Sequence, residues 1–237
     1  MSEKKGKLYL VPVPLGDTDT TEIPINLKSI LIEIPNFIVE RGKTARQFLK
    51  KMNPAIVLQQ LIMDEIAEDQ TKKDWMNMLQ PALEGKNIGL LSEAGCPGVA
   101  DPGAKIVATA YQMGIEVVPM VGPSSLLLAL MASGMNGQKF CFHGYLPAKS
   151  NELPKELKKL EMESQKNNQT QIFIETPYRN NNFIEIALNT LLPTTKFCVA
   201  CDLTLPSQYI LTLSIAEWRK KTLPNFHKRP TVFLLLA

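Results

Sequence analysis

The sequence predicts an α/β fold in which parallel strands alternate with helices. Between residues 88 and 133, two apolar runs of strand length are each followed by a breaker-rich loop and then by apolar residues at helical spacing. The loops are Ala94-Gly95-Cys96-Pro97-Gly98 and Gly122-Pro123-Ser124-Ser125. A strand followed by a loop and a helix, repeated in this order, is typical of a parallel sheet. The chain has 237 residues and is 45% hydrophobic, and we expect two α/β domains, 1–119 and 120–237.

The first domain is expected to hold five strands and two helices. The expected strands are 8–13, 37–40, 55–60, 88–91 and 115–121, and the expected helices are 64–84 and 101–114. The first strand lies near a sheet edge or ends at Pro12, because proline cannot donate to a strand ladder. Asp101 and Pro102 suit a helix start, and Gly114 suits a helix end. The strand 115–121 is expected to be buried.

The second domain is expected to continue the alternation with shorter connections. The expected helices are 124–133, 151–169, one around 184–191, and 215–221, and the expected strands are 171–176, 196–203, 208–213 and 231–236. A Cys-x-x-Cys pair, Cys198 and Cys201, falls in one of these strands. An odd offset of three places the two thiols on opposite faces of a strand, so we reject a metal or redox site there.

The two glycine-bearing loops stand at the carboxyl ends of strands, where open α/β sheets bind ligands. Gly95, Gly98, Gly103 and Gly122 allow the backbone to approach a ligand closely. Ordinary tight turns explain the same glycines equally well. If the ligand explanation holds, valine at Gly95 or Gly122 should abolish binding and leave the fold largely intact.

Three motifs resemble a known family. They are S-E-A-G-C-P-G-V-A-D-P-G at 92–103, V-P-M-V-G-P-S-S at 118–125 and F-C-F-H-G-Y-L-P-A-K at 140–149. They resemble the tetrapyrrole-methylase superfamily of S-adenosylmethionine (SAM) methyltransferases, and within it the ribosomal RNA small-subunit methyltransferase I family. The resemblance implies a two-domain architecture, each domain a mainly parallel or mixed sheet flanked by helices, with the cofactor in the cleft between them.

The resemblance also implies a function and a set of site residues. The chain is expected to be a SAM-dependent methyltransferase acting on ribosomal RNA or the small subunit, at a ribose 2′-hydroxyl. A small-molecule, tetrapyrrole-like acceptor and a SAM-binding protein without catalysis remain as alternatives. The candidate cofactor-binding residues are Leu15, Gly16, Ser92, Glu93, Ala94, Gly95, Val99, Asp101, Met120, Gly122, Pro123, Ser124, Ser125, Tyr145, Phe173, Leu203, Pro230 and Thr231. The candidate catalytic residues are Glu40 and Lys43, and the candidate substrate-binding residues are Arg41, Arg46, Lys228 and Arg229.

The chain departs from the family pattern in the loops expected to face the acceptor. Residues 39–46 read V-E-R-G-K-T-A-R where the family has A-E-D-T-R-H-T, and residues 201–205 lack the family's Arg and Lys. Asp17, Thr18 and Asp19 suit turn and capping roles. These departures shift the expected acceptor more than the expected cofactor.

Charge and composition indicate which partners, metals and cellular compartments to expect. Residues 120–237 carry 13 Lys and Arg against 8 Asp and Glu, which favours a polyanionic partner. Two histidines are too few for a zinc constellation, so no metal is expected. No apolar run reaches the length of a membrane span and no apolar signal region follows the start, so we expect a cytoplasmic protein with no membrane partner. A homodimer is the family expectation, because an enzyme of this size needs added surface to hold a large RNA.

Overall fold

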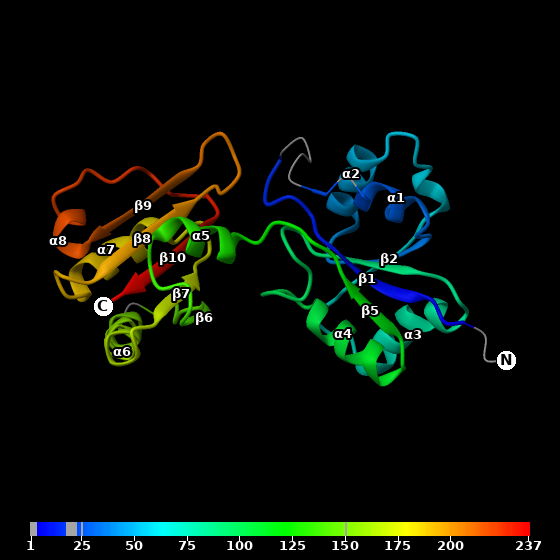
Figure 1. Cartoon of the computed structure of the whole chain (residues 1–237), viewed down its shortest axis with the longest axis horizontal. Helices are drawn as coiled ribbons and strands as arrows, with labels where there is room; N and C mark the ends of the chain where they lie inside the picture. The colour runs from blue at the N-terminus through cyan, green and yellow to red at the C-terminus, as the bar shows by residue number, and fades with distance from the viewer. Residues whose placement is uncertain (1–3, 18–22, 25, 150) are drawn as a thin grey trace. The chain divides into compact units, whose positions relative to one another are not determined.

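Two units, Met1–Ser124 and Ser125–Ala237, make up the chain. The computed structural model describes residues 4–17, 23–24, 26–149 and 151–237 (Figure 1). The boundary falls after Ser124, whereas the sequence predicts it after residue 119. Residues 120–124 stay with the first unit because they pack on its first strand and loop. The Met120 N–H donates to Leu10 O at 3.2 Å, and Gly122 lies against Pro12.

The first unit is built on a five-stranded sheet of order β3-β2-β4-β1-β5, and all four pairings in it are parallel. The strands are β1 (Lys7–Val11), β2 (Asn36–Val39), β3 (Ile62–Glu65), β4 (Ile88–Leu91) and β5 (Glu116–Pro119). Since the strands run in one direction, their carboxyl ends meet at one edge of the sheet, and the glycine loops follow β4 and β5 at that edge.

Helices cover both faces of this sheet, as strands buried on both sides require. They are α1 (Asn26–Ile32), α2 (Gly42–Met52), α3 (Lys72–Leu83) and α4 (Gly103–Gln112). Alternate strand residues divide between the two faces: Phe37 and Val39 pack in one apolar cluster with α1 and α2, while Ile38 packs in another with α3 and α4. Figure 1 shows the two helix pairs on opposite sides of the strands.

Three expectations for this unit are corrected by the structure. Residues 55–60 form no strand; a 3-10 turn, η1 (Leu58–Gln60), precedes β3 there, and α3 starts at Lys72 instead of residue 64. The strand β5 is an edge strand with two exposed residues, so it is not buried as expected. The strand β1 lies between β4 and β5 and ends before Pro12, so the second of the two alternatives for its prolines is the one observed.

The second unit has a mixed sheet of order β6-β7-β10-β8-β9, in which only the β6–β7 pairing is parallel. Its strands are β6 (Phe140–Tyr145), β7 (Thr170–Ile174), β8 (Lys196–Cys201), β9 (Tyr209–Ser214) and β10 (Thr231–Leu236). Its helices are α5 (Ser125–Ser133), α6 (Leu153–Asn167), α7 (Asn180–Thr190) and α8 (Ile215–Trp218).

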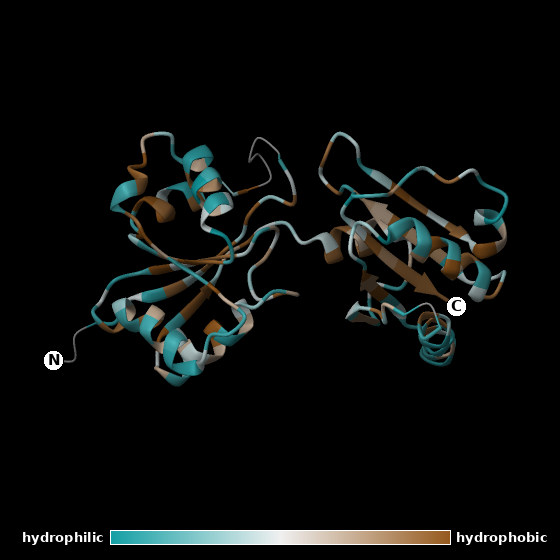
Figure 2. Ribbon diagram, turned by 180° about the vertical axis from the view of Figure 1, so that it is seen from behind, coloured by the Kyte–Doolittle hydropathy of each residue, from teal (hydrophilic) through white to brown (hydrophobic). Residues whose placement is uncertain are grey.

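One large apolar cluster joins α6, α7 and α8 to one face of this sheet, and α5 packs against β10, β9 and β8. Figure 2 shows mainly hydrophobic residues in the strands of this sheet and both hydrophilic and hydrophobic residues along the helices around it. The two sheets flanked by helices confirm the predicted fold class. None of the helices in the described part of the chain has the length and hydropathy that a membrane crossing requires.

Candidate functional site

The candidate site of the first unit lies at the carboxyl edge of its sheet, where three loops are joined to one another. Val13, just beyond β1, pairs with Gly95, beyond β4, through two backbone hydrogen bonds of 2.9 and 3.1 Å. The thiol of Cys96 donates to Pro123 O at 3.3 Å, which links the β4 loop to the loop after β5. The predicted segments 14–17, 92–101 and 120–123 are therefore neighbours.

Glu40 joins the loop after β2 to the same edge. Its Oε2 accepts the backbone N–H of Glu93 at 2.9 Å, and the Glu40 N–H donates to Leu91 O at 3.2 Å. Burial raises the pKa of the Glu40 carboxyl above its ordinary value, and the nearby carboxylates of Glu93 and Asp101 act in the same direction. The next residue, Arg41, pairs with Glu93 at 3.3 Å. The structure thus brings one candidate catalytic residue beside two candidate cofactor-binding residues.

Asp101 holds the glycine loop in shape. Its Oδ1 accepts the N–H groups of Gly98 and Gly103, each at 2.8 Å, at the start of α4. Burial raises the pKa of the Asp101 carboxyl, and the two N–H bonds oppose that rise. The helix α4 begins at Gly103 with Pro102 as its N-cap residue, one position later than predicted, and that carboxylate oxygen of Asp101 is committed to the loop.

Packing within the chain requires glycine at position 122 and the backbone conformation favours it at position 95, so the expectation that a ligand explains both glycines is corrected. A Cβ at Gly122 would overlap the ring of Pro12. A Cβ at Gly95 would stand 3.2 Å from Leu15 Cδ2, and the backbone there has φ +73°. Among the described residues, no atom lies within 4 Å of where a Cβ would stand at Gly98. Of these three, only Gly98 leaves open space.

Several backbone groups expected to hold the cofactor are paired inside the protein. The N–H of Glu93 donates to Glu40, both polar groups of Gly95 bind Val13, and the N–H of Val99 donates to Cys96 O at 3.3 Å. The Ser92 hydroxyl donates to Ala94 O at 3.2 Å. These bonds give the loop a fixed shape, and they leave fewer of its own groups available to a ligand than the sequence suggested.

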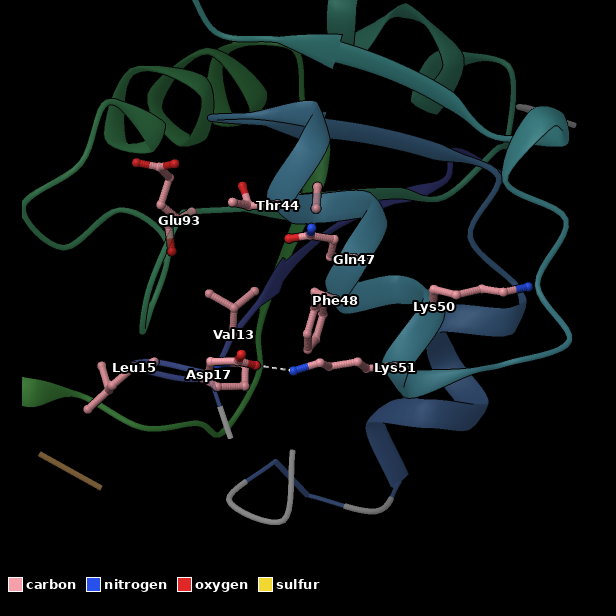
Figure 3. A pocket seen from close by; sticks show the side chains of 13 residues that line it. Val13, Leu15, Asp17, Thr44, Gln47, Phe48, Lys50, Lys51 and Glu93 are labelled. Carbon is pink, nitrogen blue, oxygen red and sulfur yellow. Dashed lines mark hydrogen bonds and ion pairs between the residues drawn. The ribbon is translucent and has the colours of Figure 1, made fainter. Parts of the chain in front are cut away.

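A cavity of about 660 Å³ opens beside this loop, within the first unit (Figure 3). Leu15, Gly16, Ser92 and Glu93 form one part of its lining, and α2 forms another. Pockets of this size hold cofactors and small ligands in other proteins. Together with the open space at Gly98, the cavity shows that the residues present suit a cofactor such as SAM.

The α2 part of the lining was missed from the sequence. Thr44, Gln47, Phe48 and Lys51 stand three, four and seven residues apart, so they lie on one face of the helix. That spacing was visible, but only the packing of α2 beside the β1 loop shows that the face borders a cavity. Asp17, expected in a turn, forms an ion pair with Lys51 that also lowers the pKa of its carboxyl, while Thr18 and Asp19 lie outside the described residues.

The two other cationic candidates of α2 are exposed. Lys43 and Arg46 both lie on the solvent side of the helix. Their expected roles stay predictions.

In the second unit, four of the five candidate cofactor residues gather at one edge of the sheet. Tyr145 pairs in register with Ile174 at the end of β6, and Asp202, next to Leu203, donates its N–H to Pro230 O at 2.9 Å. Thr231 begins β10 beside them. The hydroxyl of Thr204, next to Leu203, is buried and has no hydrogen-bond partner in the described ranges. A ligand or a water molecule could supply that partner.

Phe173 and Arg229 are corrected. Phe173 is fully buried and its ring packs against Phe183 and Phe233 with centroids 5.5 and 6.2 Å apart, because it faces the sheet's apolar cluster. Arg229 binds Asp202 Oδ2 at 2.8 Å and Ser207 O at 2.7 Å, so it ties two loops together and is not free for an acceptor. Its neighbour Lys228 is exposed, with its ammonium 5.6 Å from the ring centre of Tyr178.

The structure shows no metal site at the cysteine pair or elsewhere among the described residues. Cys198 and Cys201 are both free thiols in β8, and burial raises the pKa of Cys198 to about 11, which makes it a poor ligand or nucleophile. In the part of the chain that the structure describes, no group of three or more His, Cys, Asp or Glu side chains could hold a metal ion.

Comparison with known proteins gives consistent results. The family model described as Tetrapyrrole (Corrin/Porphyrin) Methylases matches residues 7–218. The ribosomal RNA small subunit methyltransferase I of Vibrio cholerae is 32% identical over 211 residues, 89% of this chain and 69% of that protein. The protein of the same name from Bacillus subtilis is 31% identical over 90% of this chain and 68% of its own length. The chain thus spans about two thirds of the length of these relatives.

Solved structures share the fold. The methyltransferase CobJ has a TM-score of 0.63 and 18% identity, with 98% of this chain and 94% of CobJ covered. The uroporphyrin-III C-methyl transferase of Thermus thermophilus, complexed with S-adenyl homocysteine, has a TM-score of 0.56 and 17% identity, with 98% of each chain covered.

Proposed function

Because this chain belongs to the tetrapyrrole methylase family and is a SAM-dependent methyltransferase, we propose that it methylates ribosomal RNA of the small subunit, at a ribose 2′-hydroxyl. One structural observation carries the proposal. The segment Arg41–Met52, which is α2 with its cap, holds five cationic residues and no acidic one, and its face lines the same cavity as the Ser92 loop. Cations beside a methyl-transfer site suit an acceptor with a phosphate backbone.

The chemistry asks little of the protein beyond positioning and one proton transfer. When bound, SAM supplies a methyl group that its sulfonium already activates. Leu15, Gly16, Ser92 and Ala94 are the residues proposed to hold it, with Gly98 allowing close approach. The acceptor hydroxyl then has to be aligned with that methyl group and to lose its proton.

Glu40 is the proposed proton acceptor. The N–H of Glu93 fixes its carboxylate, and burial raises its pKa, which strengthens a carboxylate as a base. With SAM bound, Glu40 would take the hydroxyl proton as the hydroxyl oxygen bonds the methyl carbon, and the electron pair of the broken carbon–sulfur bond would stay on the sulfur of the departing S-adenosylhomocysteine. Arg41, Lys43 and Arg46 are proposed to contact the RNA backbone, where their charges position the acceptor without reading its sequence.

The test is a methyl-transfer assay with tritiated SAM and three acceptors: small subunits that lack the modification, naked ribosomal RNA, and a metabolite fraction. We expect label in the RNA of small subunits, and mass spectrometry of nuclease fragments should locate it on a ribose. Label only in the metabolite fraction would replace the proposal with a small-molecule acceptor. SAM binding by calorimetry without transfer to any acceptor would leave a non-catalytic SAM-binding protein.

We further propose that the enzyme is a cytoplasmic homodimer. A ribosomal acceptor accounts for the compartment. On α5, Leu127 and Met131 are 52% and 78% exposed and stand four residues apart, so they form an apolar strip that a second copy could cover. Light scattering should give twice the monomer mass of 26.4 kDa at assay concentration, and a single-chain mass would contradict the dimer.

A further inference from the structure

The α2 face of the cavity has a chemistry that the proposed cofactor contacts do not use. Val13 and Phe48 are apolar side chains of the lining on this side. In Figure 3 the Gln47 side chain points from α2 toward the space between the helix and Val13. A slot with apolar sides and an amide at one wall suits a flat ring that carries hydrogen-bonding groups on its edge.

The Gln47 amide is available to such a ligand. Across residues 4–17, 23–24, 26–149 and 151–237 no group hydrogen-bonds it, whereas the nearby Thr44 hydroxyl is already donated to Arg41 O at 3.0 Å. A glutamine offers a donor and an acceptor side by side, which is the pattern that pairs with the edge of a nucleobase. The Gln47 side chain is exposed, so solvent can hydrogen-bond its amide until a ligand takes that place, and an anion would be better served by a cation at this position.

The charges at the cavity suit the rest of a nucleotide. Lys50 and Lys51 both line the cavity, and Lys51 pairs with Asp17 across its lower side in the view of Figure 3. That ion pair is solvent-exposed, so it contributes little stability. Phosphate groups at the mouth would find cations there, while Ser92 and Glu93 stand at another wall, next to the proposed methyl source.

We propose that the α2 side of this cavity receives the acceptor nucleotide while the cofactor lies at its Leu15 and Ser92 side, and that Gln47 reads the edge of the base while the ring lies against Phe48 and Val13. The inference rests on the proposed RNA acceptor and names the residue that selects within it. Single-stranded or unstacked nucleotides are the form in which RNA bases are read in this way, since their edges and faces are both exposed.

The test compares Gln47→Leu with the matched control Gln80→Leu, an exposed glutamine on α3. We expect Gln47→Leu to lower kcat/KM for the RNA acceptor about 10- to 100-fold, the usual worth of one paired base contact. SAM affinity by calorimetry and the urea midpoint should stay at wild-type values, and Gln80→Leu should match wild type throughout. A second readout uses four acceptor RNAs that differ only in the base at the modified nucleotide. Wild type should prefer one of them, and Gln47→Leu should lose that preference.

Each result decides between distinct alternatives. A Gln47→Leu enzyme with wild-type kcat/KM and wild-type base preference would overturn the inference and leave the RNA acceptor standing. A loss of SAM affinity as large as the loss of activity would overturn it by assigning the cavity to the cofactor. If wild-type enzyme methylates no RNA at all, the proposed acceptor fails and this inference fails with it.

Discussion

At the scale of single residues, two carboxylates organise the loops of the site. Asp101 binds two amides of the β4 loop and α4, and Glu40 binds one amide of the same loop from β2. Both are partly buried, and for both burial is the largest cause of a raised pKa. The sequence predicts Asp101 at a helix start, where its carboxylate can accept a backbone N–H, but it does not predict that the same oxygen also accepts the N–H of Gly98, because that depends on how the loop folds.

Replacing Asp101 should separate its hydrogen bonds from its charge. Asp101→Ala leaves two N–H groups without their acceptor and should lower the free energy of unfolding by about 1–2 kcal/mol. Asp101→Asn keeps an oxygen in place and should lose much less. Because the folded state raises the pKa, it binds the proton more tightly than the unfolded state, so wild-type stability should fall as pH rises from the ordinary pKa through the raised one. Urea denaturation across pH 3–7 should show a weaker fall for Asp101→Asn, and an equal fall would contradict this account.

Replacing Glu40 should affect catalysis and spare binding. Glu40→Gln can still accept the Glu93 N–H but cannot take a proton, so kcat for methyl transfer should drop about 10²–10⁴-fold. SAM affinity should change little. In wild type, kcat should rise with pH as the Glu40 carboxyl ionises, with a midpoint above the ordinary value because burial raises its pKa. A Glu40→Gln enzyme with undiminished kcat would remove Glu40 from the reaction and leave the proton to another group.

At the scale of elements, the errors of sequence interpretation have identifiable causes. The segment 62–69 carries good helix formers, yet Ile62–Glu65 forms an edge strand because pairing with β2 outweighs local preference. A capping box of Thr71 and Asp74 marks the start of α3, and in it Asp74 Oδ2 accepts the Thr71 N–H at 2.8 Å and the Thr71 hydroxyl at 2.7 Å. The two central residues of β5, Val117 and Val118, are typical of a buried strand, and the sheet order shows that β5 lies at an edge.

The contact between the loops after β1 and β5 gives a prediction at this scale. Because a Cβ at Gly122 would overlap Pro12, Gly122→Ala should push the two loops apart and lower the free energy of unfolding by about 1–3 kcal/mol. Gly137 is a matched control: no described atom lies within 4 Å of its Cβ position, so Gly137→Ala should change stability by less than about 0.5 kcal/mol. Thermal and urea denaturation measure both. An unchanged midpoint for Gly122→Ala would revive the idea that a ligand fills this space.

At the scale of the whole molecule, fold and cofactor were predictable where the acceptor was not. The motif S-E-A-G-C-P-G-V-A-D-P-G can be recognised in the sequence because many of its residues are needed to hold one loop in one shape. The hydrogen bonds of Asp101, Gly95 and Cys96 show this. The proposed acceptor contacts are side chains of α2, and none of these residues belongs to a recognisable motif. Their proposed role depends on the fold, which places α2 beside the β1 loop, so no local sequence pattern could have predicted it.

If the acceptor is RNA, binding should depend steeply on salt, because each neutralised phosphate releases counterions. The logarithm of the association constant should fall linearly with the logarithm of salt concentration, with about 0.7 units of slope for each phosphate contacted on a single strand. Lys43 and Arg46 are the exposed cations of α2 to vary, since Arg229 holds Asp202 and Ser207 and its loss would disturb the fold. Lys43→Gln with Arg46→Gln should reduce the slope by about 1–1.5 units and weaken binding to all RNA sequences alike. Filter binding or fluorescence anisotropy between 50 and 300 mM salt measures the slope, and calorimetry should show unchanged SAM affinity. An RNA affinity that is flat across this range would count against a polyanionic acceptor, because neither the cations of α2 nor those of the second unit would then be contacting phosphates.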